Sequence, residues 1–277
     1  MENRKIPLAG VIGCPIAHSK SPQIHGHWLR TLGISGHYIP MDVTPEDLEN
    51  VIRTLPRAGF VGVNVTIPHK ERVLEIADIC TDRATLIGAA NTLIFRKDSK
   101  ILADNTDGYG FMKNLEMAES GWQPGSGPAA LFGAGGAARA VVAALLHAGV
   151  PEIMISNRTR VRAEALQSEF GKRITVFDWV QAGNMLDTAK LVVNTTSLGM
   201  IGKPPLRVPL DGLRKGTLVT DLVYAPLKTK LLQTAEEMGC STVDGLGMLL
   251  HQAVPGFERW FGERPEVDSA TRAAALR

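Results

Sequence analysis

The fold is decided by the stretch Pro128-Ala-Ala-Leu-Phe-Gly-Ala-Gly-Gly-Ala-Ala138, near the middle of a chain of 277 residues. It begins apolar, continues through the glycines of Gly133–Gly136, and leads into an alanine-rich run that reaches Ala148. This order predicts a strand, a tight glycine turn and a helix, in the pattern G-x-G-x-x-A. Such a turn lets a pyrophosphate approach the backbone, and the free N–H groups at the helix start bind it. The stretch therefore predicts a Rossmann-type dinucleotide site.

The segment after the next predicted strand indicates which dinucleotide is bound. That strand is Glu152–Ser156, and Asn157-Arg158-Thr159-Arg160-Val161-Arg162 follows it. An NAD site usually has an acidic residue here for the ribose 2′-hydroxyl, whereas arginines suit a 2′-phosphate. Arg158 and Arg162 therefore favour NADP.

Composition limits the remaining function classes. Hydrophobic residues make up 44% of the chain and the formal net charge is +2, so nothing predicts binding to nucleic acid or to an acidic membrane. Three distant cysteines predict neither a disulfide framework nor a zinc site. The segment Met1–Lys5 lacks the apolar core of a signal peptide, and no uncharged apolar run is long enough to span a bilayer. We expect a cytoplasmic protein that is a monomer or a homodimer.

Apolar segments alternate with helical patterns, which predicts an α/β fold with parallel sheets. Ser21 is expected to cap a helix that starts at Pro22, and Thr44 to cap one that starts at Pro45. A hairpin is expected around residues 97–99, and Pro255 should kink or interrupt a C-terminal helix.

Four polar stretches lie where predicted apolar elements end, which is where α/β sheets bind ligands. They are His18–Ser21, Asn64–Lys70, Asp104–Gly108 with Asn91 upstream, and Asp244–Gln252. Each also has an ordinary explanation, because serines cap helices, lysines are commonly solvated, and Asp, Asn and Gly form turns. No histidine spacing predicts a metal site, and no G-x-S-x-G predicts a serine hydrolase. A metal-free hydride-transfer enzyme fits these patterns best.

Eight motifs in order make the chain resemble the shikimate/quinate dehydrogenase family over nearly its whole length. The motifs are Val11–Pro22, Asn64–Lys70, Gly88–Thr92, Asp104–Gly108, Gly133–Ala137, Asn157–Thr159, Asn194–Met200 and Asp244–Met248. The resemblance implies reversible, NADPH-dependent reduction of 3-dehydroshikimate to shikimate, in the pathway that leads to chorismate and the aromatic amino acids. Relatives often carry an acid and a proline where this chain has Lys228 and Lys230.

The resemblance also implies roles for individual residues. Lys70 and Asp107 match the catalytic pair, with Lys70 as general acid and base. The substrate-binding set implied is Ser19, Ser21, Thr66, Asn91, Tyr224 and Gln252. The cofactor-binding set implied is Gly133, Ala134, Gly135, Gly136, Ala137, Asn157, Arg158, Thr159, Arg162 and Gly245.

The implied layout has a substrate-binding domain over 1–106, an NADP-binding Rossmann-like domain over 107–241, and a helical segment over 242–277 that returns to the first domain. Two alternatives remain open. One is a quinate/shikimate dehydrogenase of broader specificity, which Arg158 and Arg162 disfavour only if it uses NAD. The other is a non-catalytic NADP-binding regulator, which would have no need of both Lys70 and Asp107.

Overall fold

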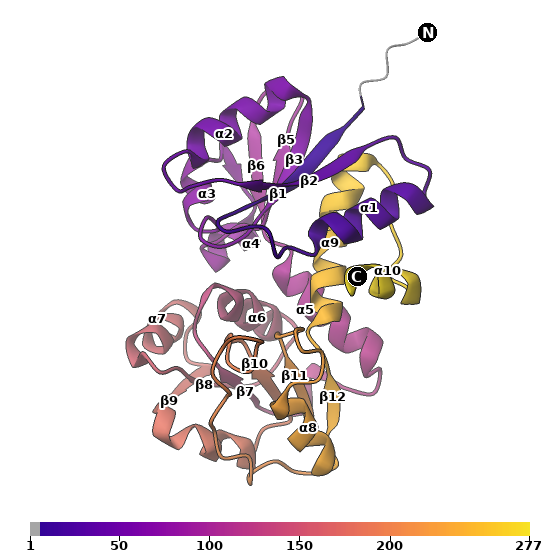
Figure 1. Cartoon of the computed structure of the whole chain (residues 1–277). Helices are drawn as coiled ribbons and strands as arrows, with labels where there is room; N and C mark the ends of the chain where they lie inside the picture. Colours follow the sequence, from indigo (N-terminus) through magenta and orange to yellow (C-terminus); the bar gives the residue numbers. More distant parts are fainter. Residues whose placement is uncertain (1–5) are drawn as a thin grey trace. The chain divides into compact units, whose positions relative to one another are not determined.

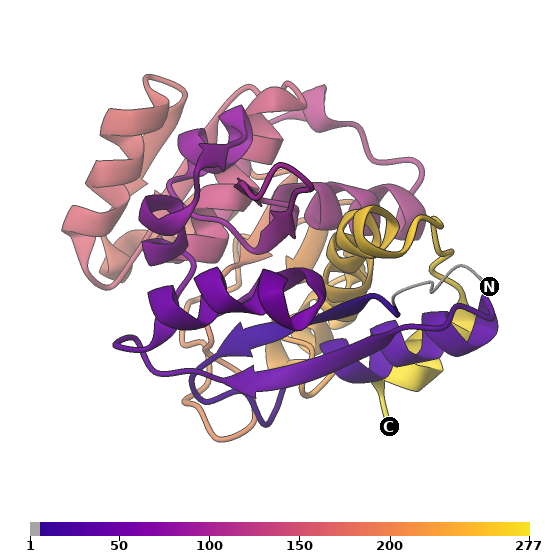
Figure 2. The same cartoon turned by 90° about the horizontal axis from the view of Figure 1, so that it is seen from above.

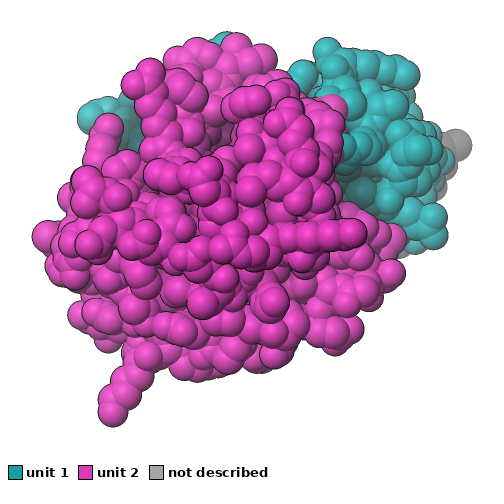
Figure 3. All heavy atoms as spheres, turned by 90° about the horizontal axis from the view of Figure 1, so that it is seen from below, with its two compact units in different colours: residues 1–107, 250–277 teal, residues 108–249 magenta. Residues whose placement is uncertain are grey.

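The computed structural model describes residues 6–277, so the segment 1–5 that lacks a signal-peptide core lies outside the described residues. The chain divides into two compact units, which Figure 3 distinguishes by colour. The first unit comprises residues 1–107 and 250–277, and the second comprises residues 108–249. Each unit contains one six-stranded sheet with helices packed on it (Figure 1).

The sheet of the first unit has the strand order β2-β1-β3-β5-β6-β4. Its strands are β1 (Leu8–Gly13), β2 (His37–Asp42), β3 (Phe60–Val65), β4 (Ile79–Cys80), β5 (Thr92–Phe95) and β6 (Ile101–Asp104). The sheet is mixed rather than wholly parallel, because β5 pairs antiparallel with both β3 and β6. The hairpin expected around residues 97–99 joins β5 to β6, with Ser99 in the left-handed region at φ 64°.

The helices of the first unit bury apolar side chains against this sheet. They are α1 (Ser21–Thr31), α2 (Leu48–Thr54), a 3₁₀ turn (Leu55–Ala58), α3 (Arg72–Ile76), α4 (Asp82–Ile87) and α10 (Ser269–Ala275). The core includes Ile12, Ile52, Val63 and Leu93, all fully buried. Helix α10 lies beside α1 (Figure 2), and the indole N–H of Trp28 donates to Thr271 Oγ1 at 3.1 Å.

The second unit is a doubly wound parallel sheet with the order β12-β11-β10-β7-β8-β9. Its strands are β7 (Ala129–Phe132), β8 (Ile153–Ser156), β9 (Ile174–Phe177), β10 (Leu191–Asn194), β11 (Leu218–Asp221) and β12 (Ser241–Val243). Its helices are α6 (Gly136–His147), α7 (Arg160–Phe170) and α8 (Lys230–Glu237), with 3₁₀ segments at Pro124–Ser126 and Trp179–Asp187. Leu131 and Phe132 belong to different hydrophobic clusters, so both faces of β7 are covered.

Two helices contain the points where the chain passes between units. Helix α5 (Asp107–Ala118) starts at the last residue of the first unit's N-terminal part, and α9 (Leu246–Phe261) contains the division between Leu249 and Leu250. The second unit therefore extends beyond the predicted limit at 241, because β12 pairs with β11 and completes the sheet.

Two local predictions are wrong, and the interruption expected at Pro255 does not occur. Helix α1 begins at Ser21 itself, with Lys20 as its N-cap, so Ser21 is not the cap. Helix α2 begins at Leu48 rather than Pro45, because residues 44–47 form a turn in which the Asp47 N–H donates to the Thr44 carbonyl. Helix α9 runs through Pro255 without interruption, since packing of its buried residues, among them Phe257, outweighs the cost of the proline.

Within residues 6–277, no helix is both long and apolar enough to cross a membrane. The same residues contain no group of three or more His, Cys, Asp or Glu side chains placed to hold a metal ion.

Candidate active site

Strand order brings three of the four polar stretches to one edge of the first sheet. Strands β1 and β3 are parallel neighbours, so the loops that follow Gly13 and Val65 leave the sheet side by side. The amide N–H of Cys14 in one loop donates to the carbonyl of Ile67 in the other at 3.1 Å. Because β5 is antiparallel to β3 and β6, its first residue, Thr92, lies opposite the ends of both strands, at Asn64 and Asp104.

Lys70 and Asp107 form an ion pair at this edge. The Lys70 Nζ atom lies 2.6 Å from Asp107 Oδ2, with the lysine side chain 24% exposed and the carboxylate side chain 9% exposed. The Lys70 carbonyl accepts the N–H of Ala90, which ties the lysine's backbone to the segment before β5. The ammonium is thus held by a buried carboxylate while part of its side chain remains accessible to a ligand.

Asn91 connects this pair to Gln252. Its Nδ2 atom lies 2.8 Å from Asp107 Oδ1, 3.0 Å from Gln252 Oε1 and 2.9 Å from Thr106 Oγ1. The two amide hydrogens are therefore shared among three acceptor atoms. Asn91 is 2% exposed and Gln252 is 8% exposed, so the network is shielded from water. The structure thus brings four predicted site residues into one hydrogen-bonded group: Lys70, Asn91, Asp107 and Gln252.

Thr66 and Ser19 lie on the two adjacent loops, and Ser21 is the first residue of α1. Thr66 follows β3, and its N–H donates to the Ile12 carbonyl at 2.9 Å. Ser19 is half-buried and its Oγ accepts the N–H of Ser21 at 3.3 Å, whereas Ser21 is buried. The Ser19 hydroxyl proton is directed to no described protein acceptor, so this hydroxyl can donate to a carboxylate.

A buried carboxylate outside the predicted set supports the Asn105–Asp107 turn. Asp104 is 1% exposed and accepts hydrogen bonds from Arg83 Nε at 2.6 Å and Thr81 Oγ1 at 2.8 Å. Burial opposes ionisation, but the hydrogen bonds from Arg83 and Thr81 outweigh it and lower the pKa of Asp104. Asp104 Oδ1 also accepts the N–H of Asn105, so the anion holds the turn that presents Asp107.

Tyr224 belongs to the second unit and lies on the loop after β11. Burial raises the pKa of its phenol, so the side chain stays a neutral hydrogen-bond donor. The loop is held by Asp221, which accepts the N–H of Val223 at 3.0 Å and the hydroxyl of Thr229 at 2.7 Å. The pKa of Asp221 is raised because burial outweighs these hydrogen bonds.

The glycine turn after β7 has the predicted geometry and has room for phosphates. Gly133 has φ +108°, and a Cβ there would lie 2.6 Å from Thr195 Oγ1, so only glycine fits. Gly135 is the N-cap of α6, and a Cβ on Gly135 or Gly136 would meet no atom within 4 Å. Ala138 is fully buried, which permits close packing of the helix on the sheet. Helix α6 has 12 residues, and the open backbone at its start can bind the phosphates of a dinucleotide.

Asn157 joins the glycine turn to the arginine segment. Its Oδ1 accepts the N–H of Ala134 at 3.2 Å, and its Nδ2 donates to the Thr159 carbonyl at 2.8 Å. Arg158 and Arg162 are exposed, and the described residues provide neither with an acidic partner. Arg160, by contrast, pairs with Glu164 and Asp178. Two of the three arginines are thus available for a 2′-phosphate.

Gly245 lies against the end of β11. A Cβ there would come 2.4 Å from the Leu222 carbonyl oxygen and 2.6 Å from that of Asp221, so close packing explains the glycine.

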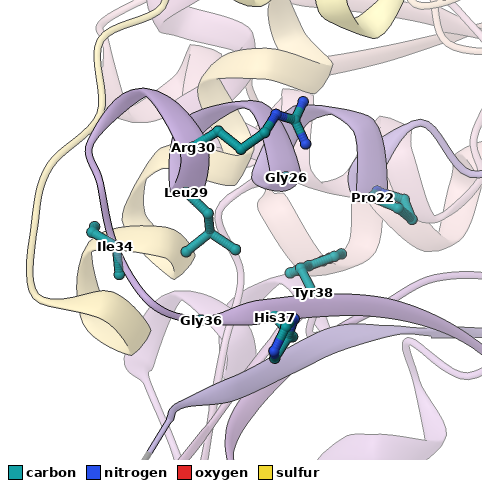
Figure 4. A pocket seen from close by; sticks show the side chains of 8 residues that line it. All are labelled: Pro22, Gly26, Leu29, Arg30, Ile34, Gly36, His37 and Tyr38. Carbon is teal, nitrogen blue, oxygen red and sulfur yellow. The ribbon is translucent and has the colours of Figure 1, made fainter.

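A separate surface pocket lies between α1 and β2, lined by residues that include Pro22, Arg30 and Tyr38 (Figure 4). None of the predicted site residues lines it.

Three family models match the chain. The model described as shikimate dehydrogenase substrate binding domain matches residues 11–93, and shikimate / quinate 5-dehydrogenase matches residues 120–201. The model described as shikimate 5′-dehydrogenase C-terminal domain matches residues 245–275. A curated relative from Ruegeria sp. (strain TM1040), named shikimate dehydrogenase (NADP(+)), is 67% identical over 276 residues, which is 100% of both chains.

Solved structures agree in fold. Shikimate 5-dehydrogenase from Thermus thermophilus, in complex with NADP(H) and shikimate, is 36% identical with a TM-score of 0.86, covering 98% of each chain. Quinate dehydrogenase from Corynebacterium glutamicum, in complex with NAD, is 30% identical with a TM-score of 0.91, covering 98% of this chain and 99% of that one. On these matches, the chain belongs to the shikimate dehydrogenase family.

Proposed function

We propose that this chain is an NADP-dependent shikimate dehydrogenase that interconverts 3-dehydroshikimate and shikimate on the route to chorismate and the aromatic amino acids. The observation that carries the proposal is the pair Lys70–Asp107, 2.6 Å apart and joined through Asn91 to Gln252. A protein that only bound the cofactor would have no need of a partly accessible ammonium held by a buried carboxylate.

The pair supplies the proton chemistry of a ketone reduction. When bound, NADPH supplies the hydride. Lys70 Nζ donates a proton to the oxygen that gains negative charge, and its positive charge stabilises that oxygen as the charge develops. In the oxidative direction the neutral amine accepts the hydroxyl proton. Asp107 orients the amine through Oδ2 and receives the Asn91 amide through Oδ1.

Substrate binding is assigned to hydroxyl and amide groups around the pair. Ser19, just before α1, and Ser21, its first residue, are assigned to the carboxylate, and so is Tyr224. Thr66, Asn91 and Gln252 bind the ring hydroxyls together with Lys70 and Asp107. Hydroxyls and amides match this ligand because they both donate and accept hydrogen bonds.

Cofactor binding is assigned to the glycine turn and the segment after β8. The backbone of Gly133–Ala137 would hold the pyrophosphate, while Asn157 stabilises the turn by accepting the N–H of Ala134. Arg158, supported by Arg162 and Thr159, would hold the 2′-phosphate, since an unpaired guanidinium is available for a bidentate contact. Gly245 is assigned to the cofactor site as well.

A quinate dehydrogenase is the second candidate, because a quinate dehydrogenase bound to NAD is similar over nearly the whole chain. The two exposed arginines favour NADP over NAD, but they do not distinguish quinate from shikimate. The cytoplasmic location and the monomeric or homodimeric state stay predictions.

The test is product formation by the purified full-length chain. With shikimate and NADP⁺, we expect 3-dehydroshikimate and NADPH to appear in equal amounts, measured by chromatography and absorbance. If no product forms in either direction while calorimetry still detects NADP⁺ binding, the enzyme assignment is wrong and the chain is a binder.

A further inference from the structure

A line of buried side chains is joined to Asn91 by hydrogen bonds. It consists of Tyr38 on β2, Asn64 at the end of β3 and Thr92 at the start of β5, with exposures of 8%, 5% and 1%. Figure 4 shows the Tyr38 ring between α1 and β2. Asn64 and Thr92 belong to neither the substrate-binding nor the cofactor-binding set.

Backbone partners determine which way each amide in this line points. Asn91 Oδ1 accepts the N–H of Thr106 at 2.9 Å, and a backbone N–H can only donate. Asn64 Nδ2 lies 3.1 Å from the Asn91 carbonyl, which can only accept. The oxygen and nitrogen of both amides are therefore identified without ambiguity.

The hydroxyls complete a chain of hydrogen bonds with a single direction. Tyr38 donates to Asn64 Oδ1 at 2.7 Å, and Asn64 Nδ2 donates to Thr92 Oγ1 at 3.3 Å. Because Asn91 Oδ1 can only accept, the Thr92 hydroxyl donates to it at 2.9 Å. Asn91 Nδ2 then donates to Asp107 Oδ1 at 2.8 Å.

The alternative orientation of Asn91 would place its oxygen against the Asp107 carboxylate. Two acceptors would then face each other without water, which is unfavourable in a buried site. The Thr106 N–H and the Thr92 hydroxyl both count against that orientation, because each donates to Asn91 Oδ1 at 2.9 Å.

We propose that Thr92, oriented by Asn64, is a positioning residue that acts together with the Thr106 N–H to hold the Asn91 amide with its N–H groups toward Asp107 and the substrate. The proposal rests on the proposed function. It assigns to Thr92 no contact with substrate, so its effect is transmitted through Asn91.

The test compares Thr92→Val, which keeps the shape and removes the hydroxyl, with Thr92→Ser, which keeps the hydroxyl. We expect Thr92→Val to lower kcat/KM for shikimate roughly tenfold, with KM for NADP⁺ unchanged, and Thr92→Ser to stay near wild type. Thr217→Val is the matched control, because Thr217 is 3% exposed and donates to the Ala189 carbonyl in the second unit. Thr217→Val should keep the wild-type kcat/KM for shikimate even when its Tm falls as much as that of Thr92→Val.

A second comparison tests the route through Asn91. In an Asn91→Ala background, Thr92→Val should cost little further activity, because the group through which Thr92 acts is gone. If Thr92→Val does not fold, Thr92→Ala provides the same comparison.

The outcomes separate this inference from the proposed function. An inactive wild-type chain overturns both. With an active wild type, the inference alone fails if Thr92→Val is as active as wild type, if Thr92→Ser is as impaired as Thr92→Val, or if the full loss persists in the Asn91→Ala background.

Discussion

Lys70 and Asp107 lie 37 positions apart in the sequence, yet their side chains meet with Nζ 2.6 Å from Oδ2. The meeting follows from strand order: Lys70 lies in the loop after β3, Asp107 follows β6, and β5 pairs with both strands. The sheet thus places an ammonium and a carboxylate at one edge without any local motif that joins them.

Replacing Lys70 should affect turnover more than binding. We expect Lys70→Ala to lower kcat by roughly 10²–10⁴-fold, the range for loss of a general acid–base, with a smaller change in KM for shikimate. Steady-state kinetics will measure this, with Lys97→Ala as a control because Lys97 is exposed on the β5–β6 hairpin. A near-normal kcat in Lys70→Ala would remove Lys70 from the chemistry.

Substitutions of the arginines after β8 should differ sharply in their effect on KM for NADP⁺. Arg158→Ala should raise KM for NADP⁺ roughly tenfold or more and leave KM for NAD⁺ unchanged, because only NADP⁺ carries the 2′-phosphate. Arg160→Ala is the matched control, since its guanidinium is already paired with Glu164 and Asp178. Equal effects of the two substitutions on KM for NADP⁺ would refute the assignment of Arg158.

Ser19 should contribute to substrate binding through its free hydroxyl proton. Ser19→Ala removes a hydrogen bond to a carboxylate, so KM for shikimate should rise roughly tenfold with little change in kcat. Initial rates at varied shikimate will show this, and Ser126→Ala, at an exposed serine of the second unit, should leave KM unchanged. An unaltered KM in Ser19→Ala would exclude the carboxylate role.

Asp104 should stabilise the fold in a pH-dependent manner. Its pKa is lowered below the ordinary 3.8, so its contribution is complete at neutral pH and is lost as the pH falls through the folded-state pKa. Asp104→Asn should therefore cost roughly 1.5–3 kcal/mol at pH 7, where charged hydrogen bonds are lost, and progressively less in acid. Urea unfolding at several pH values will measure this.

The control for that experiment is Asp98→Asn, because Asp98 pairs with Arg96 at the surface. It should change stability little at any pH. A loss in Asp104→Asn that does not diminish in acid would contradict the proposed origin of the effect.

Much of the second unit could be predicted from the sequence, because its parallel strands are short apolar runs bounded by turns. The glycine turn, α6 and β8 lie where their patterns place them. Helix starts were harder: Thr44-Pro45 has the composition of a cap, yet α2 begins at Leu48 because the preceding residues form a separate turn.

The candidate site could be predicted only in part, for a similar reason. Lys70 and Asp107 lie within recognisable motifs, whereas Asn64 and Thr92 lie opposite each other only because β3 pairs antiparallel with β5. Both lie within motifs of the family, but nothing in their spacing indicates that they are opposite each other. The sequence around Asp104 likewise indicates a turn residue, and only the fold brings Arg83 beside it.

The most direct measurement is kcat/KM for the purified wild-type chain with shikimate and with quinate, each paired with NADP⁺ and with NAD⁺. Oxidation should be followed by the absorbance of the reduced cofactor, at one pH and one enzyme concentration. The proposed function predicts the highest value for shikimate with NADP⁺. Activity confined to quinate with NAD⁺ would contradict it.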